Sequence, residues 1–207
     1  MDEQVLGAMQ KWPNVPAVYG WLSLSAQGDW LLHPHGDARK GQSGEKIANE
    51  QIRQFMNRNY AANEAGEWFF QNGPQRVYVD LAGAPYIVRL ADDMQTLLTH
   101  NELPVTRISQ WLLDEQGRLY MQTEHGAAML AGRDMGLLST RLLVMPETND
   151  TSAAATPLDQ EHLQALQEGN TLLVSLDVAA SLTAPIQWLD NKHIPARLGF
   201  VREPVAG

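Results

Sequence analysis

Short runs in which apolar and polar residues alternate recur along this chain and predict β-strands. Residues 19–33 contain two such runs on either side of the turn signal AQGD, and residues 108–130 contain two more around the signal DEQG. A further turn signal, EHG at residues 124–126, divides the second region again. Because tight turns between such runs join neighbouring antiparallel strands, we expect hairpins or a meander at both places.

Two segments have the apolar spacing of an amphipathic helix instead. The first spans residues 2–11 and ends before Pro13. The second has apolar side chains at i, i+4, i+7, i+8 and i+12, namely Ala48, Ile52, Phe55, Met56 and Tyr60. Helices packed on hairpins are the pattern of an α+β fold, so we predict antiparallel hairpins or a meander packed by a few amphipathic helices.

Two shorter helices are predicted from capping residues. One covers residues 92–98, where Asp92 or Asp93 would cap the first turn. The other follows Thr156, with Pro157 at its first helical position and Gly169 at its end.

A small, polar and proline-bounded segment, PETNDTSAAATP at residues 146–157, is the predicted linker of the chain. It would separate a main α+β domain at residues 1–145 from a C-terminal part at residues 158–207. That part would contain a helix and short strands at residues 172–176 and 188–201, and we expect it to pack on the main domain.

The stretch WFFQNGPQRVYVDLAGAPYIVRL, residues 68–90, predicts three strands joined by two turns. With residues 72–75 as the first turn, Phe70 falls opposite Val77, and apolar side chains share one face. The polar segment QNGPQ is therefore predicted to be a turn, and no ligand is needed to explain it.

The second turn of this stretch is predicted at residues 82–85. It places Val79 opposite Val88, so the apolar face continues onto a third strand. A slip of one residue at either turn would bury Arg76 or Arg89, and this fixes the expected register.

The opposite face of these strands is polar and carries Arg76, Tyr78 and Asp80, with Arg89 opposite Tyr78. Two interpretations are open. The face is either a solvated surface, whose cross-strand pairs contribute roughly 0.2–1 kcal/mol each, or a site for a carboxylate or phosphate, because guanidinium groups offer paired donors. Arg76, Tyr78 and Arg89 are therefore the candidate ligand-binding residues, although Asp80 would neutralise one arginine.

The segment HPHGD, from His33 to Asp37, has the spacing that lets two imidazoles and a carboxylate meet one metal ion in a metallo-hydrolase. The proline and glycine inside it disfavour a regular strand, and Ala38 stands where the metallo-β-lactamase-like motif has a further histidine. We therefore expect a surface loop without a metal. His33, His35 and Asp37 remain the residues of an alternative interpretation, a metal-dependent or acid/base hydrolase.

The segments NRNYAANEAGEWFFQNGPQRVYVDLAGAPYIVRL, GEKIANEQI and LLDEQGRLYM together resemble a family of proteobacterial conserved hypothetical proteins, a domain of unknown function with a WFFQNGPQRVYV core. The resemblance covers roughly residues 12–145, and the core block is its most specific part. It implies a bacterial cytoplasmic protein, and it implies no activity, cofactor or catalytic residue.

Composition excludes several classes of function. The chain has no cysteine, so it contains neither disulfides nor thiolate metal sites. The net charge is −9, residues 142–191 contain seven acidic residues and no Lys or Arg, and no basic run is longer than Arg39-Lys40. Nucleic-acid binding is therefore not expected. No apolar run has the length of a signal peptide or a membrane span, and we expect a cytoplasmic protein.

Two functional hypotheses follow. The first is a non-enzymatic α+β protein that binds a small anionic ligand or a protein partner without a cofactor. The second is the hydrolase described above. The chain lacks the G-x-S-x-G, phosphate-loop and dinucleotide motifs, and this favours the first hypothesis. The oligomeric state is open, as is whether the similar residues 21–36 and 111–126 arose by duplication.

Overall fold

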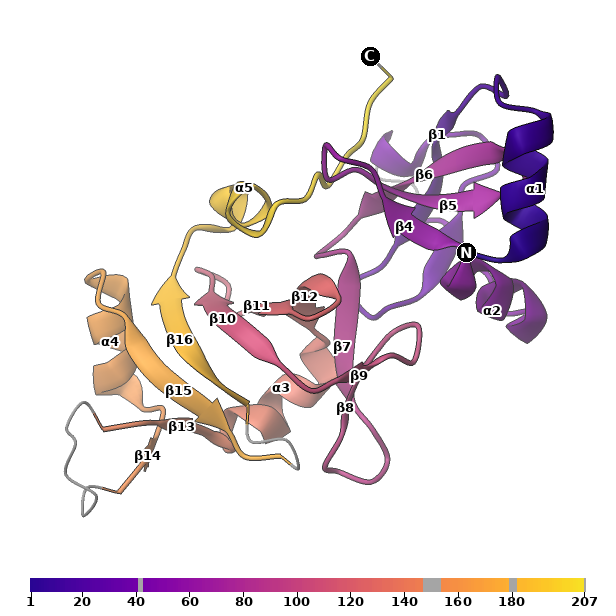
Figure 1. Cartoon of the computed structure of the whole chain (residues 1–207). Coiled ribbons are helices and arrows are strands. Elements are labelled where there is room, and N and C mark those ends of the chain that lie inside the picture. Colours follow the sequence, from indigo (N-terminus) through magenta and orange to yellow (C-terminus); the bar gives the residue numbers. More distant parts are fainter. Residues whose placement is uncertain (41–42, 147–153, 179–181, 207) are drawn as a thin grey trace. The chain divides into compact units, whose positions relative to one another are not determined.

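The computed structural model describes residues 1–40, 43–146, 154–178 and 182–206. These residues form two compact units. The first joins Met1–Pro85 to the C-terminal Gly199–Gly207, and the second is Tyr86–Leu198. Each unit has its own sheet with helices (Figure 1). The predicted α+β class is confirmed.

The sheet of the first unit has the strand order β3-β2-β1-β6-β5-β4. Its strands are β1 (Val18–Leu24), β2 (Trp30–Leu32), β3 (Glu45–Lys46), β4 (Tyr60–Ala62), β5 (Trp68–Asn72) and β6 (Gln75–Leu81). Neighbours are antiparallel except β1 and β6, which are parallel. The predicted hairpin over residues 19–33 is confirmed, and so is the turn after β5, because Phe70 pairs with Val77.

The helix α1 (Glu3–Lys11) confirms the first amphipathic prediction. The helix α2 (Glu50–Arg58) confirms the second in its central part, since Ala48 precedes the helix and Tyr60 begins β4. The short 3-10 helix η1 (Ala38–Lys40) lies between the two helices in sequence. Asn49 caps α2, since its side-chain oxygen accepts the N–H of Ile52 at 3.1 Å. In α2 Met56 is buried but Ile52 is exposed. The apolar stripe of this helix is therefore covered over part of its length.

The C-terminal segment returns to the first unit. The N–H of Leu81 donates to the carbonyl of Arg202 at 2.8 Å. Gly66 has a φ of +77°, and a Cβ at this position would lie 2.6 Å from the carbonyl oxygen of Gly199. This close approach requires a glycine, because any side chain would displace the C-terminal segment.

The sheet of the second unit has the order β14-β13-β15-β16-β10-β11-β12-β7-β8-β9. Its strands are β7 (Tyr86–Leu90), β8 (Leu97–Thr99), β9 (Pro104–Val105), β10 (Ile108–Leu113), β11 (Leu119–Thr123), β12 (Gly126–Leu130), β13 (Leu142–Val144), β14 (Thr156–Pro157), β15 (Leu172–Leu176) and β16 (Leu182–Trp188). The turns predicted within residues 108–130 are confirmed by the antiparallel pairs β10–β11 and β11–β12.

The helical elements of the second unit are α3 (Gly132–Ser139), α4 (Gln160–Gln167), η2 (Asn191–His193) and α5 (Ile194–Leu198). Over the ranges that the structure describes, none of the helices has the length and apolarity needed to cross a bilayer.

The predicted turn at residues 82–85 does not join two paired strands, and that prediction is wrong. β6 pairs with β1 and β5 in the first unit, whereas β7 pairs with β8 and β12 in the second. The alternation of side chains along a strand shows which of its residues share a face, but it does not identify the strand that lies beside it. Tyr86, Ile87 and Val88 are all buried, as in a strand that is covered on both faces.

Two capping predictions are also wrong. Residues 92–98 do not form a helix, because Met94 has a φ of +59° and β8 begins at Leu97. The helix α4 is capped by Asp159 instead of Thr156. The Asp159 carboxylate accepts the backbone N–H groups two and three residues further on, at 3.0 and 3.1 Å. Thr156 pairs with β13 as part of β14.

The strand predicted at residues 188–201 is wrong for most of its length, since β16 ends at Trp188 and the chain becomes helical at Asn191. The helix α3 was not predicted. Its sequence, GRDMGLLS, contains two glycines, which disfavour a helix in the absence of tertiary contacts.

The predicted linker at residues 146–157 contains residues 147–153, which lie outside the described residues. The last two residues of the predicted linker, Thr156 and Pro157, form β14, which pairs with β13, and β13 also pairs with β15. The boundaries of the two compact units fall after Pro85 and after Leu198. The exposure of this segment stays a prediction.

Candidate functional site

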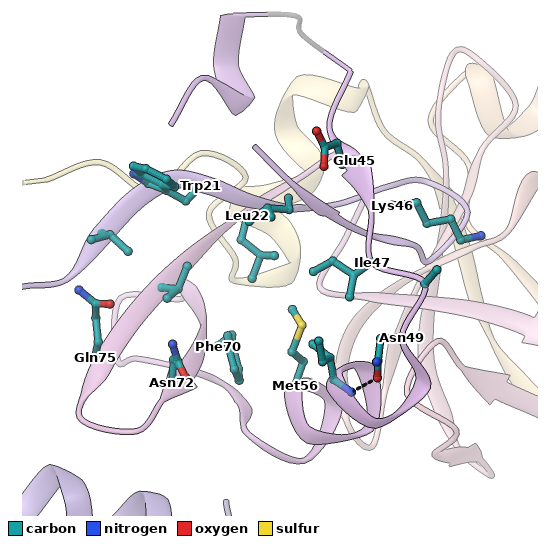
Figure 2. A pocket seen from close by; sticks show the side chains of 15 residues that line it. Trp21, Leu22, Glu45, Lys46, Ile47, Asn49, Met56, Phe70, Asn72 and Gln75 are labelled. Atoms are coloured by element: carbon teal, nitrogen blue, oxygen red, sulfur yellow. Dashed lines mark hydrogen bonds between the residues drawn. The ribbon is translucent and has the colours of Figure 1, made fainter. Parts of the chain in front are cut away.

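A cavity of about 670 Å³ lies in the first unit, between α2, the connection that precedes it and one face of the sheet. Figure 2 shows Leu22, Ile47, Met56 and Phe70 around a common space. The full lining consists of Val18, Trp21, Leu22, Leu32, Glu45, Lys46, Ile47, Ala48, Asn49, Ile52, Met56, Phe70, Asn72, Gln75 and Val77. We call this the apolar cavity. Its volume is within the range of small-molecule sites, roughly 300–1,000 Å³.

Three large side chains that line the apolar cavity are exposed: Trp21 at 43%, Leu32 at 41% and Ile52 at 49%. Single exposed apolar side chains are ordinary on a protein surface, but a group of them around one cavity makes that cavity a candidate binding site. Complete burial of a side chain of this kind contributes roughly 1.5–3 kcal/mol. A molecule in the cavity would gain part of this free energy by covering them.

The polar side chains of the lining lie at its margins and are mostly occupied. The Asn49 side chain caps α2, and this hydrogen bond is the dashed line in Figure 2. Lys46 extends away from the other labelled side chains, and its Nζ lies 2.7 Å from the Oδ1 of Asp29. Asn72 and Gln75 lie together at another edge. The cavity therefore offers an apolar interior, with neutral amides and the Glu45 carboxylate at its margin.

The hairpin of β5 and β6 lines a second cavity with its other face, because successive side chains of a strand point to opposite sides. The apolar cavity takes Phe70, Asn72, Gln75 and Val77 from this hairpin, whereas the second cavity takes Gln71, Pro74, Arg76 and Tyr78. The second cavity has a volume of about 440 Å³, and Met9 of α1 and Trp12, the residue after this helix, also line it. We call it the arginine cavity.

The structure brings together two of the three residues of the predicted anion site. Arg76 and Tyr78 both line the arginine cavity. Arg89 belongs to β7 of the second unit, where it pairs with Leu98 across the strands. Its Nη2 donates to both carboxylate oxygens of Glu102, each at 2.8 Å. The expected position of Arg89 opposite Tyr78 is therefore wrong, and Arg89 has a carboxylate partner of its own.

Asp80, which we expected to neutralise an arginine of this face, is held by a different residue. The Nε of Arg39 donates to one Asp80 oxygen at 2.9 Å, and Arg39 also donates to the carbonyl of Pro204. Burial raises the pKa of the Asp80 carboxyl, against the opposing effect of the Arg39 hydrogen bond. The Asp80 carboxylate is thus matched with Arg39 and leaves Arg76 without this partner.

The residues of the HPHGD segment do not come together. His33 is buried, and its Nε2 lies 2.8 Å from the hydroxyl of Ser23, whereas His35 is exposed. Within the described ranges, no group of three or more His, Asp or Glu side chains is arranged to hold a metal ion. The Nδ1 of His33 has no hydrogen-bond partner there either, so no carboxylate orients the imidazole as a serine hydrolase requires.

Sequence reasoning missed the apolar cavity. Its lining comes from segments between Val18 and Val77, and the same apolar residues would serve equally well as core positions. The sequence signal was present in α2, whose apolar stripe is longer than the part that is buried. Only the tertiary arrangement distinguishes the uncovered residue, Ile52, from its covered neighbour, Met56.

Comparison with known proteins identifies a family. A family model described as "Protein of unknown function (DUF2946)" matches residues 1–205. This match confirms the predicted resemblance to a domain of unknown function and extends it beyond residues 12–145. No curated protein matches the chain.

Two solved structures are similar to this chain. A DUF1285 family protein from Silicibacter pomeroyi DSS-3 is 14% identical, with a TM-score of 0.48 and 84% of each chain covered. A DUF1285 family protein from Shewanella baltica OS155 is 16% identical, with a TM-score of 0.37, covering 56% of this chain and 87% of the other. Neither similarity identifies a ligand or an activity for this chain.

Proposed function

Because the chain belongs to the family of proteins of unknown function described as DUF2946, we propose a function from the geometry of its first unit. The protein binds a small, uncharged and largely apolar molecule in the apolar cavity and does not catalyse a reaction on it. The observation that supports this proposal is the convergence of the exposed Trp21, Leu32 and Ile52 on one cavity. Desolvation of these side chains is the main source of binding free energy.

The charges at the margin disfavour an anionic ligand. The Lys46 ammonium group is engaged by Asp29. Glu45 is exposed at the margin and would repel an anionic head group. The amides of Asn72 and Gln75 can exchange hydrogen bonds with a neutral polar end. An apolar body with one hydroxyl or carbonyl group fits this arrangement.

The lining supports binding more than chemistry. Among the described residues that form it there is no Ser, Thr, Cys, His or Asp, so the cavity has no hydroxyl or thiol nucleophile beside a histidine base, and the Lys46 amine is paired with Asp29. The residues of the alternative hydrolase, His33, His35 and Asp37, do not line this cavity. The proposal therefore keeps the non-enzymatic hypothesis and assigns the ligand an apolar character.

The proposal places the protein in the cytoplasm, without nucleic acid as a partner. The absence of cysteine from the 207 residues is compatible with a reducing compartment. The net charge of −9 disfavours attraction to a phosphate backbone. A protein partner is an alternative occupant of the same surface, and the size of the molecule that competes for the cavity distinguishes the two.

Titration with N-phenyl-1-naphthylamine, an uncharged molecule that fluoresces in apolar surroundings, tests the proposal. We expect saturable binding of one molecule per chain. Ile52→Ser and Leu32→Ser should each weaken it about tenfold, which corresponds to about 1.4 kcal/mol of lost apolar contact. Both positions are exposed, so the fold should survive both changes.

Leu137→Ser provides the matched control, because Leu137 is an exposed apolar residue on a helix of the second unit. Its affinity for the probe should equal that of the wild type. Equal weakening by all three substitutions would indicate nonspecific adsorption and contradict the proposal. Displacement by a protein fraction but by no small apolar compound would assign the surface to a protein partner.

A further inference from the structure

We infer that the arginine cavity is a separate binding site for a small carboxylic acid that also carries an apolar group and a hydrogen-bond donor. It shares no lining residue with the apolar cavity. The inference is therefore independent of the proposed function. Three features of the arginine cavity define the ligand: a cation, an acceptor and an apolar wall.

The cation is Arg76, which is half-buried on β6. Its guanidinium carbon lies 4.6 Å from the centroid of the Phe69 ring. Within the part of the chain that the structure describes, Arg76 forms no ion pair with a carboxylate. A guanidinium group held against a ring keeps its in-plane N–H groups available, and these match the two oxygens of a carboxylate.

The acceptor is Gln71, whose side chain is buried, with 1% of the residue exposed. Its Nε2 donates to the carbonyl of Gly73 at 2.9 Å, and this bond fixes the orientation of the amide. The Oε1 is left buried without a hydrogen-bond partner among the described residues. A buried acceptor without a partner is unfavourable, so a ligand that donates a hydrogen bond to it gains affinity.

The wall is apolar. It consists of Met9, Trp12, Pro13, Val15 and Ala17, from α1 and the segment that follows it. Half of the Trp12 surface is exposed, and the Nζ of Lys11 lies 4.5 Å from the centroid of its ring. The wall can cover an aromatic or aliphatic group, while Lys11 adds positive charge beside it.

The arrangement of these groups defines the class of ligand. A carboxylate meets Arg76, a hydroxyl or N–H group meets the Oε1 of Gln71, and an apolar group meets the wall. A 2-hydroxy acid or an acylated amino acid with an aromatic side chain has all three. Inorganic phosphate has no apolar group, so it leaves the wall uncovered.

Calorimetric titration of the whole protein with three related probes tests the inference. Phenyllactate has the carboxylate, the hydroxyl and the ring, and it should bind best. 3-Phenylpropanoate lacks the hydroxyl and should bind about tenfold more weakly. Phenyllactamide lacks the charge and should also bind about tenfold more weakly. This comparison uses the wild type, so it does not depend on the folding of any variant.

Two substitutions identify the residue that causes the preference for the hydroxyl and the residue that causes the preference for the carboxylate. Gln71→Met should bind phenyllactate and phenylpropanoate equally and still prefer a carboxylate. Arg76→Gln should bind phenyllactate and phenyllactamide equally and still prefer a hydroxyl. Arg89→Gln, which removes an arginine that already pairs with Glu102, should retain both preferences.

Absence of binding, or equal affinity of the wild type for the three probes, would overturn the inference. A preference for the hydroxyl that persists in Gln71→Met, or a preference for the carboxylate that persists in Arg76→Gln, would also overturn it. A negative result in these titrations would not change the binding of N-phenyl-1-naphthylamine or the sensitivity of that binding to Ile52→Ser. The two sites are therefore tested separately.

Discussion

Val79→Asp unfolds the first unit under conditions in which the wild type is stable. Val79 is completely buried on β6, where it pairs with Leu22 of β1. An aspartate there would bury a carboxylate without a partner, at a cost of several kcal/mol. That cost is a large fraction of the stability of an ordinary domain, about 5–15 kcal/mol. Denaturant unfolding followed by tryptophan fluorescence measures it.

Leu6→Asp is the control for the introduced charge. Leu6 lies on α1 of the same unit and is 44% exposed, so the carboxylate stays in water. We expect a change in the free energy of unfolding within about 0.5 kcal/mol. A tolerated Val79→Asp would show that this face of β6 does not point into the core, and it would remove the basis for the assignment of the two cavities.

Asp114→Ala should strongly destabilise the second unit. Asp114 is fully buried in the turn between β10 and β11. Its carboxylate accepts the backbone N–H groups of Gln116 and Arg118 at 2.9 and 2.8 Å, the Nε of Arg118 at 2.7 Å and the Nδ2 of Asn191 at 3.0 Å. Alanine leaves these donors without their acceptor.

We expect Asp114→Ala to lower the free energy of unfolding by about 2–4 kcal/mol. The estimate lies below the full effect of breaking a buried ion pair, because the Arg118 side chain is 32% exposed. Arg89→Ala is the comparison, since its partner Glu102 is 62% exposed and the loss should be within about 1 kcal/mol. Thermal unfolding of the two variants distinguishes a turn that organises the unit from an ordinary surface interaction.

The local elements of this fold could be predicted where the sequence contains both an alternating pattern and a tight turn. The pairs β1–β2, β5–β6, β10–β11 and β11–β12 all meet this condition, and all were predicted. The partner of β7 could not be predicted, because three consecutive buried residues show no face that selects a neighbour. The parallel pair of β1 and β6 has no local signal at all, since its strands are far apart in sequence.

The same limits apply to the prediction of the candidate sites. Arg76 and Tyr78 were selected because the register of β5 and β6 is local, and the structure places both in one cavity. Arg89 was selected through the incorrect pairing of β6 with β7. The exposure of Trp21 and Leu32 depends on what α2 leaves uncovered, and only packing between distant segments determines this.

The most direct test of the apolar cavity is an NMR titration of protein with labelled isoleucine, leucine and methionine methyl groups, using N-phenyl-1-naphthylamine. The proposed function predicts that the methyl resonances of Leu32, Ile47, Ile52 and Met56 shift together with one dissociation constant, while that of Leu137 in the second unit stays in place. Shifts that are absent from these methyl groups, or spread over both units, would contradict the proposal that this cavity is the binding site.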